Sequence, residues 1–125
     1  MRIIAIDHVQ LSMPVGEEAR AKEFYADILG LKQVPKPEAL ALRGGAWFEN
    51  DKVKVHLGVE NGFRPARKAH PAFIVDGIDE LIAVLNSKGY LVTVAEPMPG
   101  IERVHVDDPF GNRIELMEVK SDAGS

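Results

Sequence analysis

The chain has 125 residues, of which 46% are hydrophobic and 27% charged, and its formal net charge is −4. This size and composition predict one folded globular domain, and the acidic balance disfavours a nucleic-acid partner, whose phosphates need clustered Lys and Arg. No apolar run approaches the ~20 residues of a membrane span, and we expect no leader peptide, because the first apolar stretch is short. The sequence contains no cysteine, so we expect a cytoplasmic protein. Any metal ion would then be bound by nitrogen and oxygen ligands.

The first sixty residues predict a strand, a helix and further strands. Apolar and polar residues alternate over residues 3–13, which is the period-two pattern of a strand. Residues 16–29 carry apolar side chains at helical spacing, and Gly30 can end that helix in the left-handed conformation. Further strands are expected at residues 31–34, 40–42, 46–49 and 53–59.

Residues 61–69 lack periodicity and are interpreted as a linker, after which the same order of elements recurs. A strand is expected at residues 70–75, followed by an amphipathic helix for which Asp76 and Asp79 are candidate N-caps. Gly89 can end this helix. The strands expected after it lie at residues 91–95, 102–106 and 113–119.

The two halves match at three landmarks, so the sequence contains an internal repeat. A histidine begins each first strand, a glycine follows each helix, and a potential metal ligand lies in each last strand. The matching pairs are His8 and His70, Gly30 and Gly89, and His56 and Glu115. We therefore predict an α+β fold in which two βαβββ modules, at about residues 3–60 and 70–119, form a curved mixed sheet around a shared cleft, with the helices on the outer face. The whole chain, residues 1–125, would be a single domain.

Four side chains in this arrangement are candidate metal ligands, because each lies on the strand face opposite to Val, Leu or Ile neighbours. They are His8, His56, His70 and Glu115. Neutral imidazole and carboxylate ligands suit a divalent ion such as Zn²⁺, Ni²⁺, Fe²⁺, Mn²⁺ or Co²⁺. The sequence has no local metal motif such as HExxH, so the site depends on the fold bringing distant strands together. Taken alone, each histidine is more often a hydrogen-bonded structural residue.

Three stretches of the chain resemble a known superfamily. They are DHVQL at residues 7–11, FYADILGL at residues 24–31 and DPFGNRIEL at residues 108–116. The phrase FYxxxLGL followed much later by DPxGNxxE is the usual signature of the glyoxalase, bleomycin-resistance and extradiol-dioxygenase proteins, the vicinal oxygen chelate superfamily. The resemblance extends from Ile3 to about Val119 and implies the paired-module fold.

The resemblance also implies roles for individual residues. His8 and His70 fall at the ligand positions of the two opening strands, and Glu115 falls at the carboxylate ligand of the final strand. His56 takes a fourth position where similar glyoxalase I enzymes usually have Glu, which disfavours glyoxalase I activity. His8, His70 and Glu115 would match the ligand set of extradiol dioxygenases, although those chains are commonly twice as long.

The implied activity is that of a metal-dependent enzyme, a lyase, isomerase or dioxygenase that chelates a small oxygenated substrate through two neighbouring oxygens. Glu115 could also serve as the catalytic base that transfers a proton. Two further residues are candidates for substrate binding. Gln10 shares the His8 face, and Arg103 could hold a substrate carboxylate or phosphate by a bidentate contact. Each has a plainer interpretation, Gln10 as a solvated strand residue and Arg103 as half of an ion pair.

Two other functions stay open at this point. A metal-free protein that binds or sequesters a small molecule, of the bleomycin-resistance type, would use the same fold without these ligands. An interaction module would keep only a vestigial site. The resemblance further implies a homodimer, either with each site inside one chain or with modules exchanged between chains.

Overall fold

The computed structural model describes residues 1–120. The chain forms two compact units that divide after Pro65, within the predicted linker, and each unit holds one four-stranded sheet. Both sheets are mixed, because the first strand of each runs parallel to the last, whereas the other neighbours are antiparallel. The predicted α+β fold of two βαβββ modules is therefore confirmed. The union of both modules in one domain with a shared cleft stays a prediction.

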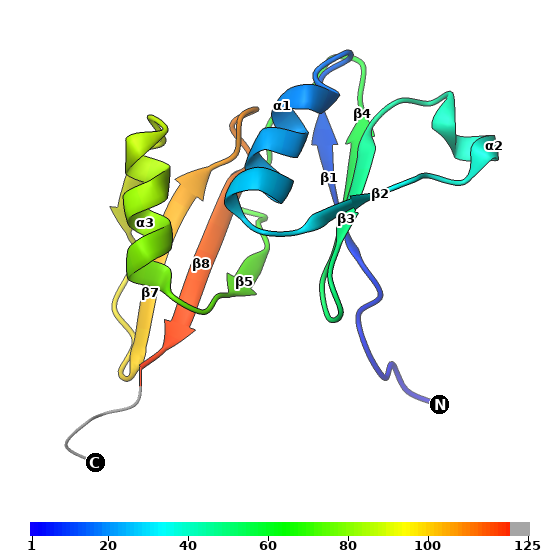
Figure 1. Ribbon diagram of the computed structural model, residues 1–125. Coiled ribbons are helices and arrows are strands. Elements are labelled where there is room, and N and C mark those ends of the chain that lie inside the picture. The colour runs from blue at the N-terminus through cyan, green and yellow to red at the C-terminus, as the bar shows by residue number, and fades with distance from the viewer. Residues whose placement is uncertain (121–125) are drawn as a thin grey trace. The chain divides into compact units, whose positions relative to one another are not determined.

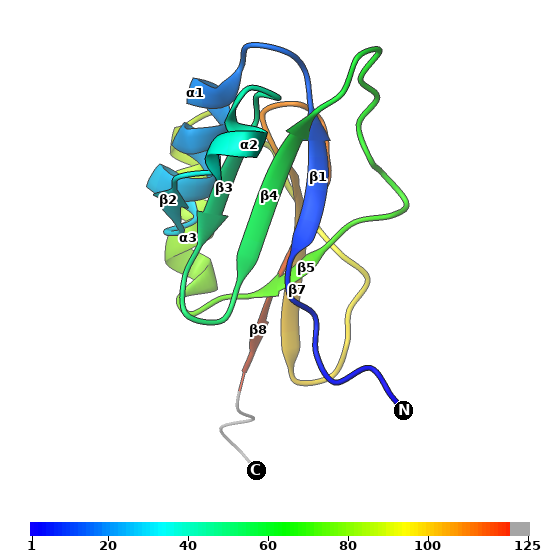
Figure 2. The ribbon, with the colours of Figure 1, turned by 90° about the vertical axis from the view of Figure 1, so that its right-hand side faces the viewer.

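The first unit contains the sheet β1-β4-β3-β2 and a helical layer on one side of it (Figures 1 and 2). Its strands are β1 (Val9–Met13), β2 (Lys32–Val34), β3 (Ala46–Glu49) and β4 (Lys54–Val59). Its helices are α1 (Glu18–Lys22), the π-helical segment η1 (Glu23–Ile28) and α2 (Glu38–Ala41). Alternation along the strands sends their apolar side chains to the face that α1 and η1 cover. The buried residues of this core include Met13, Phe24, Tyr25, Phe48, Val55 and Leu57.

Two of the strands expected in the first unit differ from those observed. The strand expected at residues 3–13 begins only at Val9, because the residues before it are exposed and pair with no other strand of the described chain. The strand expected at residues 40–42 is instead covered largely by the helix α2. Pro37 fixes the backbone angle at the start of α2, and the sequence Glu-Ala-Leu-Ala that follows has high helix propensity.

The helix expected at residues 16–29 is confirmed as α1 and η1. It widens towards its end, where the Leu29 N–H donates to the Phe24 carbonyl five residues earlier, at 2.9 Å. Gly30 follows with a φ of 81°, the left-handed conformation that a helix end favours. The chain can therefore turn sharply into β2 while the aromatic side chains of the helix stay on the sheet.

The second unit repeats this order of elements, and its sheet runs β5-β8-β7-β6 (Figure 1). Its elements are β5 (Ala72–Ile74), α3 (Ile78–Ser87), β6 (Val92–Val94), β7 (Ile101–Asp107) and β8 (Arg113–Val119). The core between α3 and the sheet buries Ile78, Leu85, Val104, Ile114 and Leu116. Full burial of one such side chain stabilises the fold by about 1.5–3 kcal/mol. Within residues 1–120, no helix combines the length and the apolar character that a membrane crossing requires.

The start of α3 is stabilised by a distant carboxylate. The predicted N-caps Asp76 and Asp79 are wrong, because the capping position is Gly77, in the left-handed conformation, with no side-chain cap of its own. Glu118 on β8 instead accepts hydrogen bonds from the N–H groups of Gly77 at 2.9 Å and Ile78 at 3.1 Å. These two bonds are the main reason that the pKa of Glu118 is lowered to about 2.

The stretch DPFGN forms the turn between β7 and β8. The Asp108 carboxylate accepts hydrogen bonds from the N–H groups of Phe110 and Asn112, both at 2.9 Å. The Asn112 side-chain oxygen in turn accepts from the Ala66 N–H at 2.9 Å, and the Arg113 N–H donates to the Ala66 carbonyl at 2.8 Å. The turn therefore fixes the segment that leads into β5.

Strand register confirms the internal repeat. The last strand of each module lies between two other strands of its sheet, so its central residue has one partner on either side. Matching these partners between the modules gives equivalent positions. They are Gln10 and Ala72, Trp47 and His105, and His56 and Glu115. His8 and His70 lie two residues before Gln10 and Ala72, so these two histidines are equivalent by sequence position. The same backbone frame therefore presents different side chains in the two units.

Candidate metal centre

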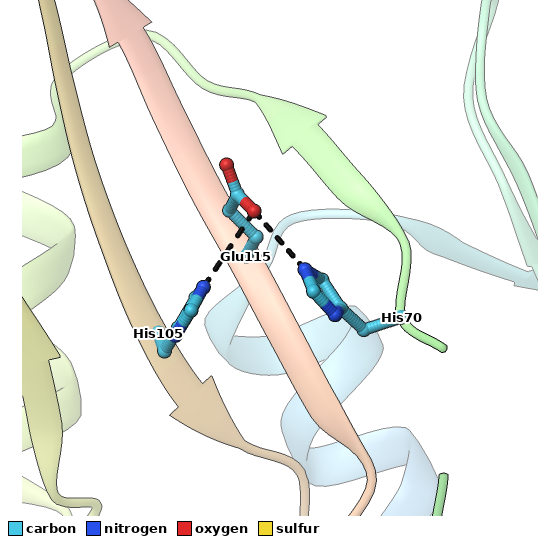
Figure 3. Close-up of side chains that lie close together, drawn as sticks. All are labelled: His70, His105 and Glu115. Atoms are coloured by element: carbon cyan, nitrogen blue, oxygen red, sulfur yellow. Dashed lines mark hydrogen bonds and ion pairs between the residues drawn. The ribbon is translucent and has the colours of Figure 1, made fainter. Parts of the chain in front are cut away.

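Three side chains of the second unit converge on one point (Figure 3). His70 precedes β5, His105 lies on β7 and Glu115 lies on β8, the strand between them. Paired residues on neighbouring strands share a face, so the register of β7 and β8 brings His105 beside Glu115. One ligand atom from each of the three lies within 4.8 Å of the others. Metal–ligand bonds of about 2.0–2.2 Å allow two ligand atoms to lie up to about 4.4 Å apart, so an ion would require only small shifts of these atoms.

The Glu115 carboxylate is the centre of this cluster, and its two oxygens have different partners. Oε1 faces the Nε2 atoms of His70 at 3.1 Å and His105 at 3.6 Å, whereas Oε2 accepts a hydrogen bond from Nε of Arg103 at 2.8 Å. The Arg103 bond, together with the nearby histidines, lowers the pKa of Glu115 to about 2 despite its burial. Glu115 is therefore ionised near neutral pH and can only accept hydrogen bonds or bind a cation.

His70 reaches the cluster with a fixed arrangement of its ring hydrogens. Its Nδ1 lies 2.9 Å from the carbonyl oxygen of Lys68, and because a carbonyl only accepts, Nδ1 carries the hydrogen. In the neutral ring Nε2 then holds a lone pair, yet this atom faces Oε1 of Glu115 at 3.1 Å. Two lone pairs at that distance repel each other unless a positive charge, a proton or a metal ion, lies between them.

His105 supplies the third ligand atom, Nε2, whose hydrogen-bonding capacity is unsatisfied within the described chain. Its Nε2 is buried and has no hydrogen-bond partner among residues 1–120, although it faces Glu115. Leaving a buried polar atom unpaired costs about 1–3 kcal/mol. A cation at the focus of the cluster would interact with His105, His70 and Glu115 together, and so remove this cost.

These observations fit a divalent metal ion. Two imidazole nitrogens and one carboxylate oxygen form a donor set that suits Zn²⁺ or Fe²⁺ and related ions. The Lys68 carbonyl behind His70 is the kind of outer partner that orients a metal-binding imidazole. Arg103 does not compete for the same oxygen, because it holds Oε2 and leaves Oε1 towards the histidines.

The first unit carries a second cluster, in which three rings stack. The rings of His8 and His56 lie 4.2 Å apart, and Trp47 lies 3.9 Å from the other face of His56, almost parallel to it. Asp7 accepts a hydrogen bond from Nδ1 of His8 at 2.9 Å, which leaves Nε2 of His8 as a possible ligand. Burial, followed by the neighbouring His8, lowers the pKa of His56, so its imidazole is neutral near pH 7.

The predicted metal ligands are thus adjacent in pairs. His70 contacts Glu115 in the second unit, and His8 stacks on His56 in the first. The convergence of these two pairs on one ion stays a prediction.

The two predicted substrate-binding residues lie beside these pairs. Gln10 lies opposite His56 across β1 and β4. Arg103 donates to Glu115 and, through Nη1, to the Glu96 carbonyl at 2.7 Å. Arg103 therefore forms the ion pair of the plainer interpretation, and its contact with substrate stays a prediction.

Sequence reasoning did not include His105 among the metal ligands. A usable signal existed in the hairpin that joins β7 to β8, because Asp107 pairs with Arg113 across the DPFGN turn. Counting outward from that pair in an antiparallel register places residue 105 opposite Glu115. The landmark repeat could not supply this residue, since Trp47 occupies the equivalent position in the first module.

Comparison with known proteins agrees with this fold. The model of the Glyoxalase/Bleomycin resistance protein/Dioxygenase superfamily matches residues 5–116. The chain belongs to this superfamily. No curated protein sequence matches the chain at a significant level.

Several solved structures share the fold. A protein from Bacillus anthracis assigned to the glyoxalase family is 48% identical, with a TM-score of 0.90 over 96% of this chain and 98% of that one. A glyoxalase/dioxygenase from Nostoc punctiforme is 22% identical, with a TM-score of 0.72 over 90% of each chain. The fosfomycin resistance protein FosX from Listeria monocytogenes is 14% identical, with a TM-score of 0.75 over 97% of this chain and 98% of that one.

Proposed function

We propose that this member of the glyoxalase superfamily is a metal-dependent enzyme that acts on a small oxygenated substrate. The observation that carries the proposal is the contact between His70 and Glu115. Nδ1 of His70 is committed to the Lys68 carbonyl, so its Nε2 needs a cation in order to lie 3.1 Å from the ionised carboxylate. The unsatisfied Nε2 of His105 at the same point supports a metal ion over a single proton, because one proton on His70 would leave His105 unpaired.

Each residue of the cluster has a separate task in this proposal. His70, His105 and Glu115 would hold the ion, which when bound acts as a Lewis acid towards substrate oxygens. The Lys68 carbonyl fixes the hydrogen of His70 on Nδ1. Arg103 holds one oxygen of Glu115 and keeps the carboxylate ionised, which leaves the other oxygen available to the metal.

The role of Glu115 as a proton-transferring base carries a condition. A carboxylate with a pKa of about 2 accepts a proton only weakly near neutral pH. Proton transfer by Glu115 therefore requires that Arg103 first releases Oε2, for example by moving to a substrate carboxylate or phosphate. In that event Arg103 would bind the substrate and activate the base in a single movement.

His8 and His56 are proposed as the further ligands that the superfamily resemblance implies. Their support is the neutral imidazole of His56 and the hydrogen bond from His8 to Asp7, which resembles the bond from His70 to Lys68. The sequence contains four histidines in total. All four therefore lie in one or other of these two clusters.

Metal analysis of the purified full-length chain tests the proposal. We expect a stoichiometric divalent ion, or uptake of added Zn²⁺, Ni²⁺, Mn²⁺ or Fe²⁺, that is lost in His70→Ala and in His105→Ala. Glu102→Gln is the matched control, because Glu102 lies on the same strand as His105 and pairs with Lys120 instead. Unchanged metal content in both histidine variants, or no uptake by the wild type, would contradict the proposal and favour a metal-free small-molecule-binding protein.

A further inference from the structure

A cavity of about 240 Å³ opens on the first unit. Its walls include Gln10 of β1, Trp47 of β3 and Gly58 of β4, on the face of the sheet that points away from the apolar core. The connection from β2 to β3, which contains α2, supplies Lys36 and Arg43. The cavity therefore lies between the polar face of the sheet and the connection from β2 to β3.

Two positive charges line this cavity, and neither has a carboxylate partner among residues 1–120. Lys36 donates to the Gly44 carbonyl, which uses one of the three donors of its ammonium group. The Arg43 side chain makes no hydrogen bond or ion pair with any residue of the described chain; only its backbone N–H is bonded, to the Leu40 carbonyl at 3.1 Å. The nearby Glu18 carboxylate accepts from the Gly45 N–H at 2.8 Å and is not part of the lining. In a chain with a net charge of −4, this is a local excess of positive charge.

The side chain of Gln10 reaches the cavity because residue 58 is glycine. A Cβ atom at Gly58 would lie 2.8 Å from Nε2 of Gln10, which is closer than such atoms approach in real proteins. The Gln10 side chain thus lies directly across β4, where its amide can donate to a ligand. Any larger residue at position 58 would displace this amide from the cavity wall.

We propose that this cavity binds the carboxylate or phosphate group of a small organic anion. The Arg43 guanidinium can bind two oxygens of such a group at once, Lys36 adds a compact charge, and Gln10 adds a neutral donor. The Trp47 ring offers a flat apolar wall to the carbon skeleton. The volume is below the ~300–1,000 Å³ of ligand pockets in general, so the ligand is a small one. This site lies in the first unit and does not rest on the metal chemistry proposed for the second.

The test uses Trp47, which is the only tryptophan of the chain. Its indole N–H gives a single assigned signal in a ¹H–¹⁵N NMR spectrum of the full-length protein. Benzoate, phenyl phosphate and benzyl alcohol are titrated after treatment with a chelator, so that no metal contributes to binding. We expect a saturable shift of the indole signal with one or both anions and none with the neutral alcohol. The tighter of the two anions identifies the head group.

Three variants complete the test. Arg43→Gln should weaken anion binding by about tenfold or more, since it removes a charge-assisted contact. Arg64→Gln removes the same charge from an exposed position of the same unit outside the cavity, and should change affinity by less than about twofold. Gly58→Ala keeps both cations and displaces Gln10, so it should also weaken binding. Equal shifts with benzyl alcohol, no shift with either anion, or wild-type affinity in Arg43→Gln would overturn the proposal.

Discussion

The two modules share one backbone frame and present different chemistry on it. In the first module the frame gathers three stacked rings, those of His8, His56 and Trp47. In the second, the residues equivalent to His56 and Trp47 are an ionised carboxylate, Glu115, and an imidazole, His105, whose buried Nε2 has no hydrogen-bond partner in the described chain. The shared backbone therefore fixes where the side chains meet, whereas the residue types at those positions decide whether the cluster contains a carboxylate.

This comparison suggests that the second module is the stronger binder of a cation. A carboxylate held ionised by Arg103 attracts a metal ion, whereas the stacked rings of the first module offer imidazole nitrogens and no carboxylate. The first module in turn places the positive charges of Lys36 and Arg43 at its cavity. Substitutions at equivalent positions of the two modules can test whether the modules have these different roles.

The largest effect is expected from removing the carboxylate itself. Glu115→Ala should weaken Zn²⁺ or Ni²⁺ binding by about a hundredfold or more, since changes at merely supporting residues already cost about 10–100-fold. His56→Ala removes the equivalent residue of the first module, and calorimetric titration of both variants compares the two. An equal loss in His56→Ala would show that both modules hold one ion, while full affinity in Glu115→Ala would contradict a metal site in the second module.

A smaller effect is expected from Arg103→Met, which removes the main cause of the low pKa of Glu115. The pKa of Glu115 should rise from about 2, so that the carboxylate becomes protonated at a higher pH than in the wild type. Protons would then compete with metal in mildly acidic solution, and affinity should fall there first. Carboxyl ¹³C NMR over pH 2–7 measures the shift. Arg67→Met breaks an exposed pair with Asp107 and should leave the titration of Glu115 unchanged.

The smallest effect concerns the N-termini of the helices, which are capped differently in the two modules. No side chain caps the N-terminus of α1, whereas Glu118 accepts from the first N–H groups of α3. The folded pKa of Glu118, about 2, lies below its ordinary value of 4.5, so this bond stabilises the protein above about pH 4.5 and its contribution is lost as the pH falls towards 2.

Glu118→Gln should therefore lower Tm at pH 7, with a difference from wild type that shrinks as the pH approaches 2. Thermal unfolding followed by circular dichroism at several pH values measures this. Glu102→Gln changes a carboxylate that shares Lys120 with Glu118 but bonds no helix N–H, so it serves as the control. A pH-independent difference would mean that charge at Glu118 is not what stabilises α3.

Local periodicity was sufficient to predict most of the fold from sequence. Alternation along the strands and the glycines after each helix are patterns that extend over only a few residues, so they can be recognised in the sequence. They revealed the repeat and matched His70 to His8 and Glu115 to His56. What failed depends on contacts between distant residues. Glu118 caps a helix that begins 40 residues earlier, so no local pattern near Asp76 reveals it. His105 joins the cluster through strand register alone.

The hydrogen bond from His70 to the Lys68 carbonyl gives the connection between the modules a chemical role. Ala66 is anchored to the last hairpin and His70 to Glu115, so the few residues between them have a set length. Inserting or deleting one residue here would rotate the Lys68 carbonyl away from the imidazole and allow the ring hydrogen to move to the other nitrogen. The length of this connection thus sets which ring nitrogen of His70 carries the hydrogen. We expect a chain with a lengthened connection to form the same strands but to bind a cation more weakly.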